Sequence, residues 1–333
     1  MYPNNQDSPM NQEIRVVSRF LVLDDDPRCR DRIRAFCDEN SLIPLKVQAD
    51  NVMGVLKSKV DLGGILLSEN FGADLGAGIR LAHAIHALRP ELPLFLRRDD
   101  CADLDNLAPP DQRLFASAFT VENMAPLKAA LNESIFSFVY PNVLVRGISE
   151  LTTAALESQF IDMKAEVESP YIVRDKLIFG EIFTLIPIEN SWCRGYMMLQ
   201  SEEQSLLELV KFDRTHVSAD KADDFRSLNS VLGEITNLIW GAFKNRYSGI
   251  ASSARNLSQV PIVINHLHRY ISFGSDNPQL CFRYTLTDKA QGDARSLVIN
   301  QKFVFNLNWN PEDFSENDIS VEDLVSSGEL DLF

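Results

Sequence analysis

The sequence lacks the patterns that mark secreted, disulfide-rich and membrane-spanning proteins. None of its 333 residues belongs to an apolar run long enough to cross a bilayer. Its five cysteines are scattered and fit neither a zinc motif nor a disulfide framework. The opening stretch MYPNNQDSPMNQEI is polar and has no basic segment followed by an apolar one, which is the mark of a signal peptide. We therefore expect a cytoplasmic protein with no membrane partner.

Basic residues are scarce relative to acidic ones. Lys and Arg number 32 against 47 Asp and Glu, which gives a formal charge of -15. A chain of this charge has no general attraction to nucleic-acid phosphates, so a nucleic-acid partner is not expected. Hydrophobic residues make up 45% of the chain, which is the composition of an ordinary globular protein. The length suits about two domains.

The first domain is predicted over residues 17–131, after a flexible polar tail at 1–16. Apolar stretches such as RFLVL, GGILL and LPLFL alternate with segments of helical spacing about every 20 residues. This rhythm predicts an α/β domain with a doubly wound parallel sheet of the flavodoxin-like kind.

The second domain is predicted over residues 138–310, where the rhythm changes to α+β. The pattern indicates a helix over 141–160 and a long helix from Asp220 to about Tyr247, with strands before and after the latter. The last residues, 311–333, contain eight acids and no base. They are interpreted as a solvated disordered tail, or alternatively as a partner-docking peptide that ends in apolar residues.

Acidic residues follow the first predicted strand directly. Ligands bind at the carboxyl ends of parallel strands, and hard divalent cations prefer carboxylate oxygens, so Asp24 and Asp25 are candidate Mg²⁺ ligands. In the alternative interpretation, Asp24, Asp25 and Asp26 are solvated acids that cap the next helix.

The stretches LVLDDD and GIRLAHAIHALRP resemble the receiver domain of response regulators over residues 17–131. In that family the third strand ends in a phosphorylated aspartate, but ILLSEN places Ser68 or Glu69 there. The fourth strand ends in Arg97 and Arg98 where the family has a hydroxyl residue, and FTVEN supplies no lysine. The resemblance therefore implies a receiver-like domain without a phosphoacceptor, in which Glu69 would at most imitate a permanent negative charge.

The long helix carries two distinct faces. Apolar residues recur every three or four positions on one face, and small or polar residues do so on another. The first face is predicted to pack and the second to receive a partner, because its small residues leave room for another backbone. The packing face comprises Phe225, Leu228, Leu232, Ile235 and Ile239, and the second face comprises Ser230, Glu234, Asn237 and Gly241.

The stretch DFRSLNSVLGEITNLIWGAF, followed by a strand entered through Pro261, resembles the CheX and CheC group of chemotaxis phosphatases over residues 138–310. The family mark, Glu-x-x-Asn on a long helix, is Glu234 to Asn237 here. The resemblance implies hydrolysis of the aspartyl phosphate on a CheY-like response regulator. Asn237 would orient the attacking water, Glu234 would pair with a lysine of the phosphorylated partner, and Mg²⁺ would be held by that partner.

CheC proteins have two such motifs, but the first helix offers Glu150 followed by Thr153, which lacks the amide. A single motif favours the CheX arrangement, which implies a homodimer joined through its sheets. Strands predicted at 279–286 and 296–309 are rich in aromatic and β-branched residues, so we expect them to form that edge. Two alternatives remain: a non-catalytic scaffold that binds regulators through the same face, and dimerisation through the receiver-like domain.

Overall fold

The structure is a computed structural model that describes residues 15–58, 61–72, 74, 76–90, 92–138, 140–174, 177–178, 181–190, 192–216, 224–247, 262–265, 271–272, 277–289 and 292–306. Several sequence expectations fall outside these residues. They concern the acidic tail at 311–333, most of the polar tail at 1–16, the residue Pro261 and the start of the long helix at 220–223.

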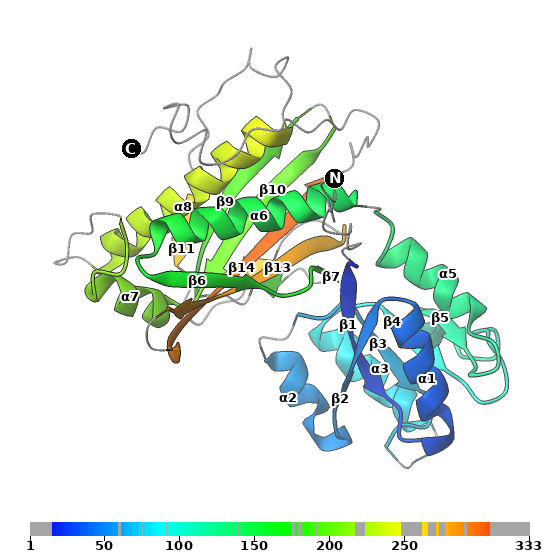
Figure 1. The fold of residues 1–333 in the computed structure, drawn as a ribbon. Coiled ribbons are helices and arrows are strands. Elements are labelled where there is room, and N and C mark those ends of the chain that lie inside the picture. Colours follow the sequence, from blue (N-terminus) through cyan, green and yellow to red (C-terminus); the bar gives the residue numbers. More distant parts are fainter. Residues whose placement is uncertain are drawn as a thin grey trace, which may run out of the picture.

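The N-terminal part is a parallel sheet with helices on both faces (Figure 1). All its strand pairs are parallel, as predicted from the alternation of strands and helices. The strands, in sheet order, are β2 (Leu42–Lys46), β1 (Val17–Leu23), β3 (Gly64–Ser68), β4 (Leu94–Arg97) and β5 (Phe115–Phe119). The helical segments are α1 (Pro27–Glu39), η1 (Ala49–Asn51), α2 (Val52–Lys57), α3 (Ala77–Leu88), α4 (Pro109–Gln112) and α5 (Ala125–Ser134).

Successive residues of β1 enter two separate apolar cores, because side chains alternate across a strand. Phe20 and Val22 pack into one cluster and Leu21 and Leu23 into the other. Both faces are therefore covered, which explains why β3 and β4 read as continuous apolar runs.

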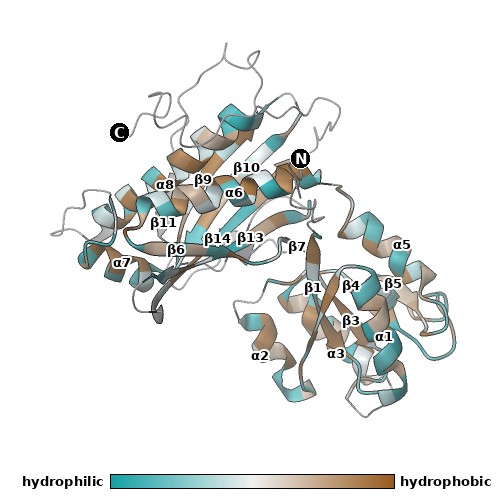
Figure 2. Ribbon diagram, viewed as in Figure 1, coloured by the Kyte–Doolittle hydropathy of each residue, from teal (hydrophilic) through white to brown (hydrophobic). Residues whose placement is uncertain are grey.

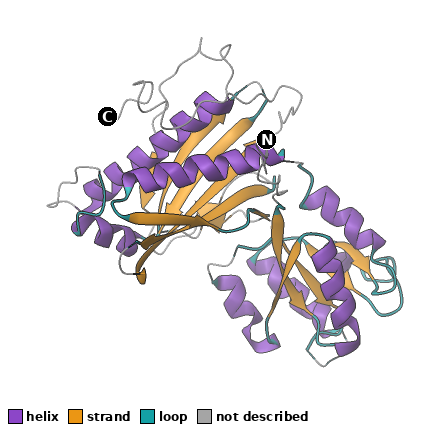
Figure 3. Ribbon diagram, in the orientation of Figure 1, coloured by secondary structure: helices purple, strands orange, loops and turns teal. Residues whose placement is uncertain are grey.

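The C-terminal part is a mainly antiparallel sheet with two long helices on one face (Figures 1 and 3). Its helices are α6 (Asn142–Gln159), α7 (Glu203–Lys211) and α8 (Asp224–Tyr247). Its strands are β6 (Met163–Val167), β7 (Tyr171–Val173), β9 (Ile182–Glu189), β10 (Arg194–Ser201), β11 (Ile262–Asn265), β13 (Gln279–Asp288) and β14 (Gly292–Asn306), with a separate short pair β8 (Leu177–Ile178) and β12 (Ile271–Ser272).

Helices α6 and α8 are held close together by a glycine and an aromatic cluster. A β-carbon at Gly147 would lie 1.7 Å from the Tyr247 hydroxyl oxygen, so only glycine fits this crossing. Trp192 packs edge-on against Tyr247, and its Nε1 donates to the Tyr247 carbonyl oxygen at 2.8 Å. These contacts fix the C-terminal end of α8 against its neighbours. Figure 2 shows the hydrophobic and hydrophilic residues that alternate along both helices.

The two parts share one continuous sheet, which the sequence pattern did not predict. Strand β7 pairs in parallel with β1, with Val17 opposite Tyr171 and Ser18 opposite Ile172, and it pairs antiparallel with β13 on its other side. The Ser18 hydroxyl also donates to the Ile172 carbonyl oxygen at 2.7 Å. Beside this seam, Asp61 accepts hydrogen bonds from Lys302 at 2.8 Å and Tyr171 at 3.0 Å.

The expectation that β13 and β14 form an open edge is wrong. Strand β14 lies between β10 and β13, and β13 pairs with β6 and β7 on its other side. The aromatic and β-branched residues of these strands reflect burial inside the sheet rather than an interface. The homodimer itself stays a prediction.

Among the helices that the structure describes, none is long and apolar enough to cross a membrane.

Candidate functional site

The inner face of α8 packs against the sheet as predicted. Leu228, Leu232, Ile235 and Ile239 are buried, while the side chain of Phe225 lies outside the described residues. Thr236 is also buried, and its hydroxyl lies 2.6 Å from that of Thr184 on β9. These contacts set the rotation of the helix about its axis and leave the opposite face outward.

The opposite face presents Glu234 and Asn237, one helical turn apart. Asn237 is exposed and Glu234 is half-buried. Within the described part of the chain neither side chain has a hydrogen-bond or ion-pair partner. Burial raises the pKa of the Glu234 carboxyl above its ordinary value, because a partly buried carboxylate loses hydration. A carboxylate and an amide are thus available to an incoming molecule on the outer face of α8, whose inner face is packed against the sheet.

Glycine 233 is a feature of this face that sequence reasoning missed. A β-carbon added at Gly233 would meet no atom within 4 Å, so nothing inside the described chain requires glycine there. Gly233 lies one turn before Asn237 and therefore beside it on the helix surface. The available signal was a glycine in the interior of a long helix, which costs about 0.5–1 kcal/mol relative to alanine.

Replacing Gly233 by alanine is expected to raise the free energy of unfolding by about 0.5–1 kcal/mol, because helix propensity improves without a clash. The measurement is urea unfolding followed by circular dichroism. Gly147→Ala is the matched control in α6, and it should be destabilising because its β-carbon would overlap the Tyr247 hydroxyl at 1.7 Å. Destabilisation by Gly233→Ala would show that the open space beside this residue is filled in solution.

The equivalent position on α6 is already engaged. Glu150 forms ion pairs with Arg246 of α8 at 3.2 Å and with Arg146 at 3.6 Å. Thr153, three residues on, is half-buried and carries no amide. The sequence interpretation that α6 lacks a second motif therefore agrees with its packing role, since its acid ties α6 to α8.

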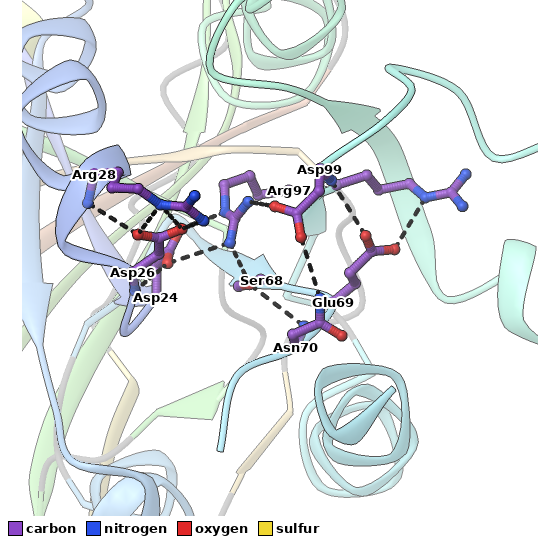
Figure 4. A network of polar contacts seen from close by, with 9 residues as sticks. Asp24, Asp26, Arg28, Ser68, Glu69, Asn70, Arg97 and Asp99 are labelled. Atoms are coloured by element: carbon purple, nitrogen blue, oxygen red, sulfur yellow. Dashed lines mark hydrogen bonds and ion pairs between the residues drawn. The ribbon is translucent and has the colours of Figure 1, made fainter. Parts of the chain in front are cut away.

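A second polar cluster lies at the carboxyl ends of β1, β3 and β4 (Figure 4). The Arg97 guanidinium at the end of β4 contacts Asp24 at 2.5 Å, donates to the Ser68 hydroxyl at 2.7 Å and pairs with Asp99. The side chains of Arg97 and Asp24 are only 4% and 5% exposed. Burial raises the pKa of Asp24, although the Asp26 amide and Arg97 oppose that rise.

The remaining sequence candidates surround this cluster. Glu69 accepts from Arg98 Nε at 3.2 Å and from the Asp99 amide at 3.2 Å. Asp25 is exposed. Asp26 caps α1 by accepting from the Arg28 amide at 2.9 Å, and its hydrogen bonds to Arg28 hold its pKa well below the usual range. The capping interpretation is thus correct for Asp26. No group of three or more His, Cys, Asp or Glu side chains in the described ranges is arranged to hold a metal ion.

The cysteines Cys29, Cys37, Cys193 and Cys281 are buried, Cys101 is partly exposed, and none of the five forms a disulfide.

No protein-family model and no curated protein matches the chain. Solved structures of two kinds are similar to it. A putative chemotaxis protein from Desulfovibrio vulgaris Hildenborough has 19% identity and a TM-score of 0.37, over 49% of this chain and 96% of its own. The chemotaxis protein CheX from Vibrio vulnificus has 19% identity and a TM-score of 0.31, over 48% and 99%. Full-length FixJ from B. japonicum has 14% identity and a TM-score of 0.30, over 44% of this chain and 70% of its own. Identity and TM-score are low in every case, so these similarities do not assign the chain to a family.

Proposed function

We propose that this chain is a cytoplasmic, CheX-like phosphatase that hydrolyses the aspartyl phosphate of a CheY-like response regulator. The observation that carries the proposal is the outward pair on α8. Asn237 is exposed, Glu234 is half-buried, and neither has a partner among the described residues. A polar pair on the outer face of a helix that is packed on its inner side is suited to act on another molecule rather than to hold this one together.

The chemistry requires little beyond positioning. An acyl phosphate is already activated, so the main task is to place a water molecule in line with the leaving oxygen. The Asn237 amide can donate one hydrogen bond and accept another, and it can therefore orient that water without adding charge next to the phosphoryl group. Charge on the phosphoryl oxygens would be neutralised by Mg²⁺ bound to the partner, so this chain needs no metal ligand for the reaction.

Glu234 is suited to docking. Its carboxylate would pair with a lysine beside the partner's phosphorylated aspartate and anchor α8 over the phosphoryl group. Burial raises the pKa of Glu234, and pairing with an incoming cation would favour its charged form.

The competing function is a scaffold that binds regulators through the same face without dephosphorylating them. Docking alone is satisfied by Glu234 and the small residues around it. It gives no reason for an amide at Asn237, where any small polar residue would serve. This difference favours catalysis.

The deciding experiment measures phosphate release from a panel of phosphorylated receiver proteins in the presence of Mg²⁺. At least one receiver is expected to lose phosphate faster with the wild-type chain than alone, and the Glu234→Ala/Asn237→Ala variant should abolish the acceleration. Binding of a phosphorylated receiver at micromolar affinity with no change in its dephosphorylation rate would establish the scaffold instead.

The receiver-like part is expected to take up no phosphoryl group. The Ser68 side chain is buried and its hydroxyl is bound by Arg97, while Glu69 is held by Arg98 and the Asp99 amide. Neither group is presented as a nucleophile. Incubation with acetyl phosphate and Mg²⁺, followed by intact-mass measurement, should show the unmodified mass. A stable gain of one phosphoryl group on residues 17–131 would contradict this.

A homodimer remains part of the proposal, but through a different edge. Strand β11 pairs with β9, and no described strand lies on its other side. Two copies could join their sheets there across a two-fold axis, which leaves both α8 faces outward. Light scattering on the full chain should give twice the 37.5 kDa of one copy. A single-copy mass at micromolar concentration would exclude the dimer.

A further inference from the structure

The carboxyl end of β1 is where the sequence suggested a divalent cation, held by Asp24 and Asp25, and the geometry there can be tested against that ion. Mg²⁺ requires a near-octahedral set of oxygen ligands at about 2.1 Å. The strongest candidate ligand is Asp24, since its side chain is buried at the end of β1. However, Asp24 Oδ2 lies 2.5 Å from Arg97 Nε, and Asp24 Oδ1 accepts from the Asp26 amide at 3.0 Å. Oδ1 is therefore held by hydrogen bonds, whereas Oδ2 makes no hydrogen bond within the described residues and is compensated by the charge of the adjacent guanidinium.

The Ser68 and Asp99 oxygens at these strand ends are engaged by the same guanidinium, and of the two sequence candidates only Asp25 is exposed. Arg97 also donates to the Ser68 hydroxyl at 2.7 Å and pairs with Asp99, which in turn accepts from Asn70 Nδ2 at 3.3 Å (Figure 4). A cation bound to the buried Asp24 oxygen would lie within contact distance of the guanidinium and be repelled by it. The residues present do not fit a divalent cation.

The register of the sheet explains why Arg97 reaches this position. Arg97 is the last residue of β4 and lies opposite Ser68, the last residue of β3. The Arg97 backbone is held in the buried strand β4. The planar guanidinium can therefore reach Asp24 after β1 and Ser68 on β3 at the same time. Asp24 and Asp99 bracket the guanidinium, and both raise the pKa of Arg97 against the opposing effect of burial.

We propose that the Arg97 guanidinium takes the place of a divalent cation at these strand ends, so that the receiver-like part is held in one fixed arrangement that needs neither metal nor phosphate. The internal cation is covalently part of the chain and cannot dissociate. Mg²⁺-dependent phosphorylation therefore cannot regulate the receiver-like part at this position.

The test compares thermal unfolding midpoints of the full chain and two matched variants. Asp24→Asn removes a carboxylate that compensates Arg97, so its midpoint should fall by about 3–6 °C. Asp25→Asn changes the exposed neighbouring acid and should leave the midpoint within about 1 °C. If the acids instead formed an ordinary cation site, removal of Asp24 would relieve repulsion and raise the midpoint.

A second measurement uses the wild-type chain alone. Addition of about 10 mM MgCl₂, a concentration above the dissociation constant of a typical weak cation site, should not change the unfolding midpoint relative to NaCl of equal ionic strength. A rise of the midpoint with Mg²⁺, or a rise in Asp24→Asn without it, would overturn the proposal.

Discussion

Replacing Asn237 by alanine is expected to lower the turnover number for aspartyl-phosphate hydrolysis by about 100-fold, with little change in the concentration of regulator needed for half-maximal rate. Misplacement of a reacting water, or loss of one positioned hydrogen bond, typically costs this much. An interaction made only in the transition state lowers kcat rather than raising KM. The measurement is steady-state phosphate release over a range of phosphorylated regulator.

The structure predicts that this loss is not a folding defect. Asn237 is exposed and has no hydrogen-bond partner among the described residues, whereas its neighbours Thr236 and Leu238 are buried. A surface change of this kind alters stability by no more than about 0.5 kcal/mol. The unfolding curve of Asn237→Ala should therefore overlay that of the wild type.

Two further variants sharpen the test. Ser230→Ala is the matched control, because alanine keeps a small side chain on the partner-facing side of α8, which is all that docking requires there, and removes only a hydroxyl that donates to the Arg226 carbonyl oxygen at 3.0 Å. It should turn over like the wild type. Glu234→Gln should raise KM more than it lowers kcat, because it removes the charge that anchors the partner. Wild-type kcat in Asn237→Ala would refute water positioning by this residue.

The outward face of α8 was predictable from sequence because a helix repeats every 3.6 residues. The apolar residues Leu228, Leu232, Ile235 and Ile239 indicated which face would be buried. The spacing of Glu234 and Asn237 placed them on another face, but a role for them came only from the resemblance to the CheX and CheC group. The parallel sheet was predictable for a similar reason, since β3 and β4 are buried on both faces and read as apolar runs.

Other features of the fold left no periodic pattern in the sequence from which they could be predicted. Strand β7 has only three residues, too few to show a period, and its pairing with β1 joins positions 171 and 17. Arg97 was recognised as a departure from the receiver pattern, but the direction of its side chain depends on acceptors from β1 and β3. Asp61 and Lys302 are 241 positions apart, and a charged pair at that separation is visible only in three dimensions.

The Asp61 and Lys302 pair at the seam between the two parts should be costly to break by removing one partner. Lys302 is only 2% exposed and Asp61 16% exposed, and Tyr171 donates to the second carboxylate oxygen at 3.0 Å. Removal of one partner from a buried pair leaves an uncompensated charge and typically costs about 3–5 kcal/mol. Lys302→Met, which keeps most of the side-chain volume, is therefore expected to lower the free energy of unfolding by about that amount at pH 7.

The pH dependence of this loss follows from the pKa of Asp61. Burial alone would raise that pKa, but Lys302 and the Tyr171 hydrogen bond outweigh burial, so the pKa is lowered in the folded chain. A lowered carboxyl pKa contributes stability above the unfolded value of about 3.9 and loses it as the pH falls toward the folded value. The difference between wild type and Lys302→Met should therefore be largest near neutral pH and shrink in acid.

Two comparisons separate this pair from a general effect of removing a lysine. Lys164→Met is the matched control, because Lys164 is 60% exposed and pairs at 3.0 Å with the exposed Glu166. Exposed pairs contribute little, so it should change stability by less than about 0.5–1 kcal/mol. Adding Asp61→Asn to Lys302→Met removes the unpaired charge while keeping an acceptor for Tyr171, and it should restore part of the lost stability. Urea unfolding of all four proteins decides: equal stability of Lys302→Met and Lys164→Met would show that the seam does not depend on this ion pair.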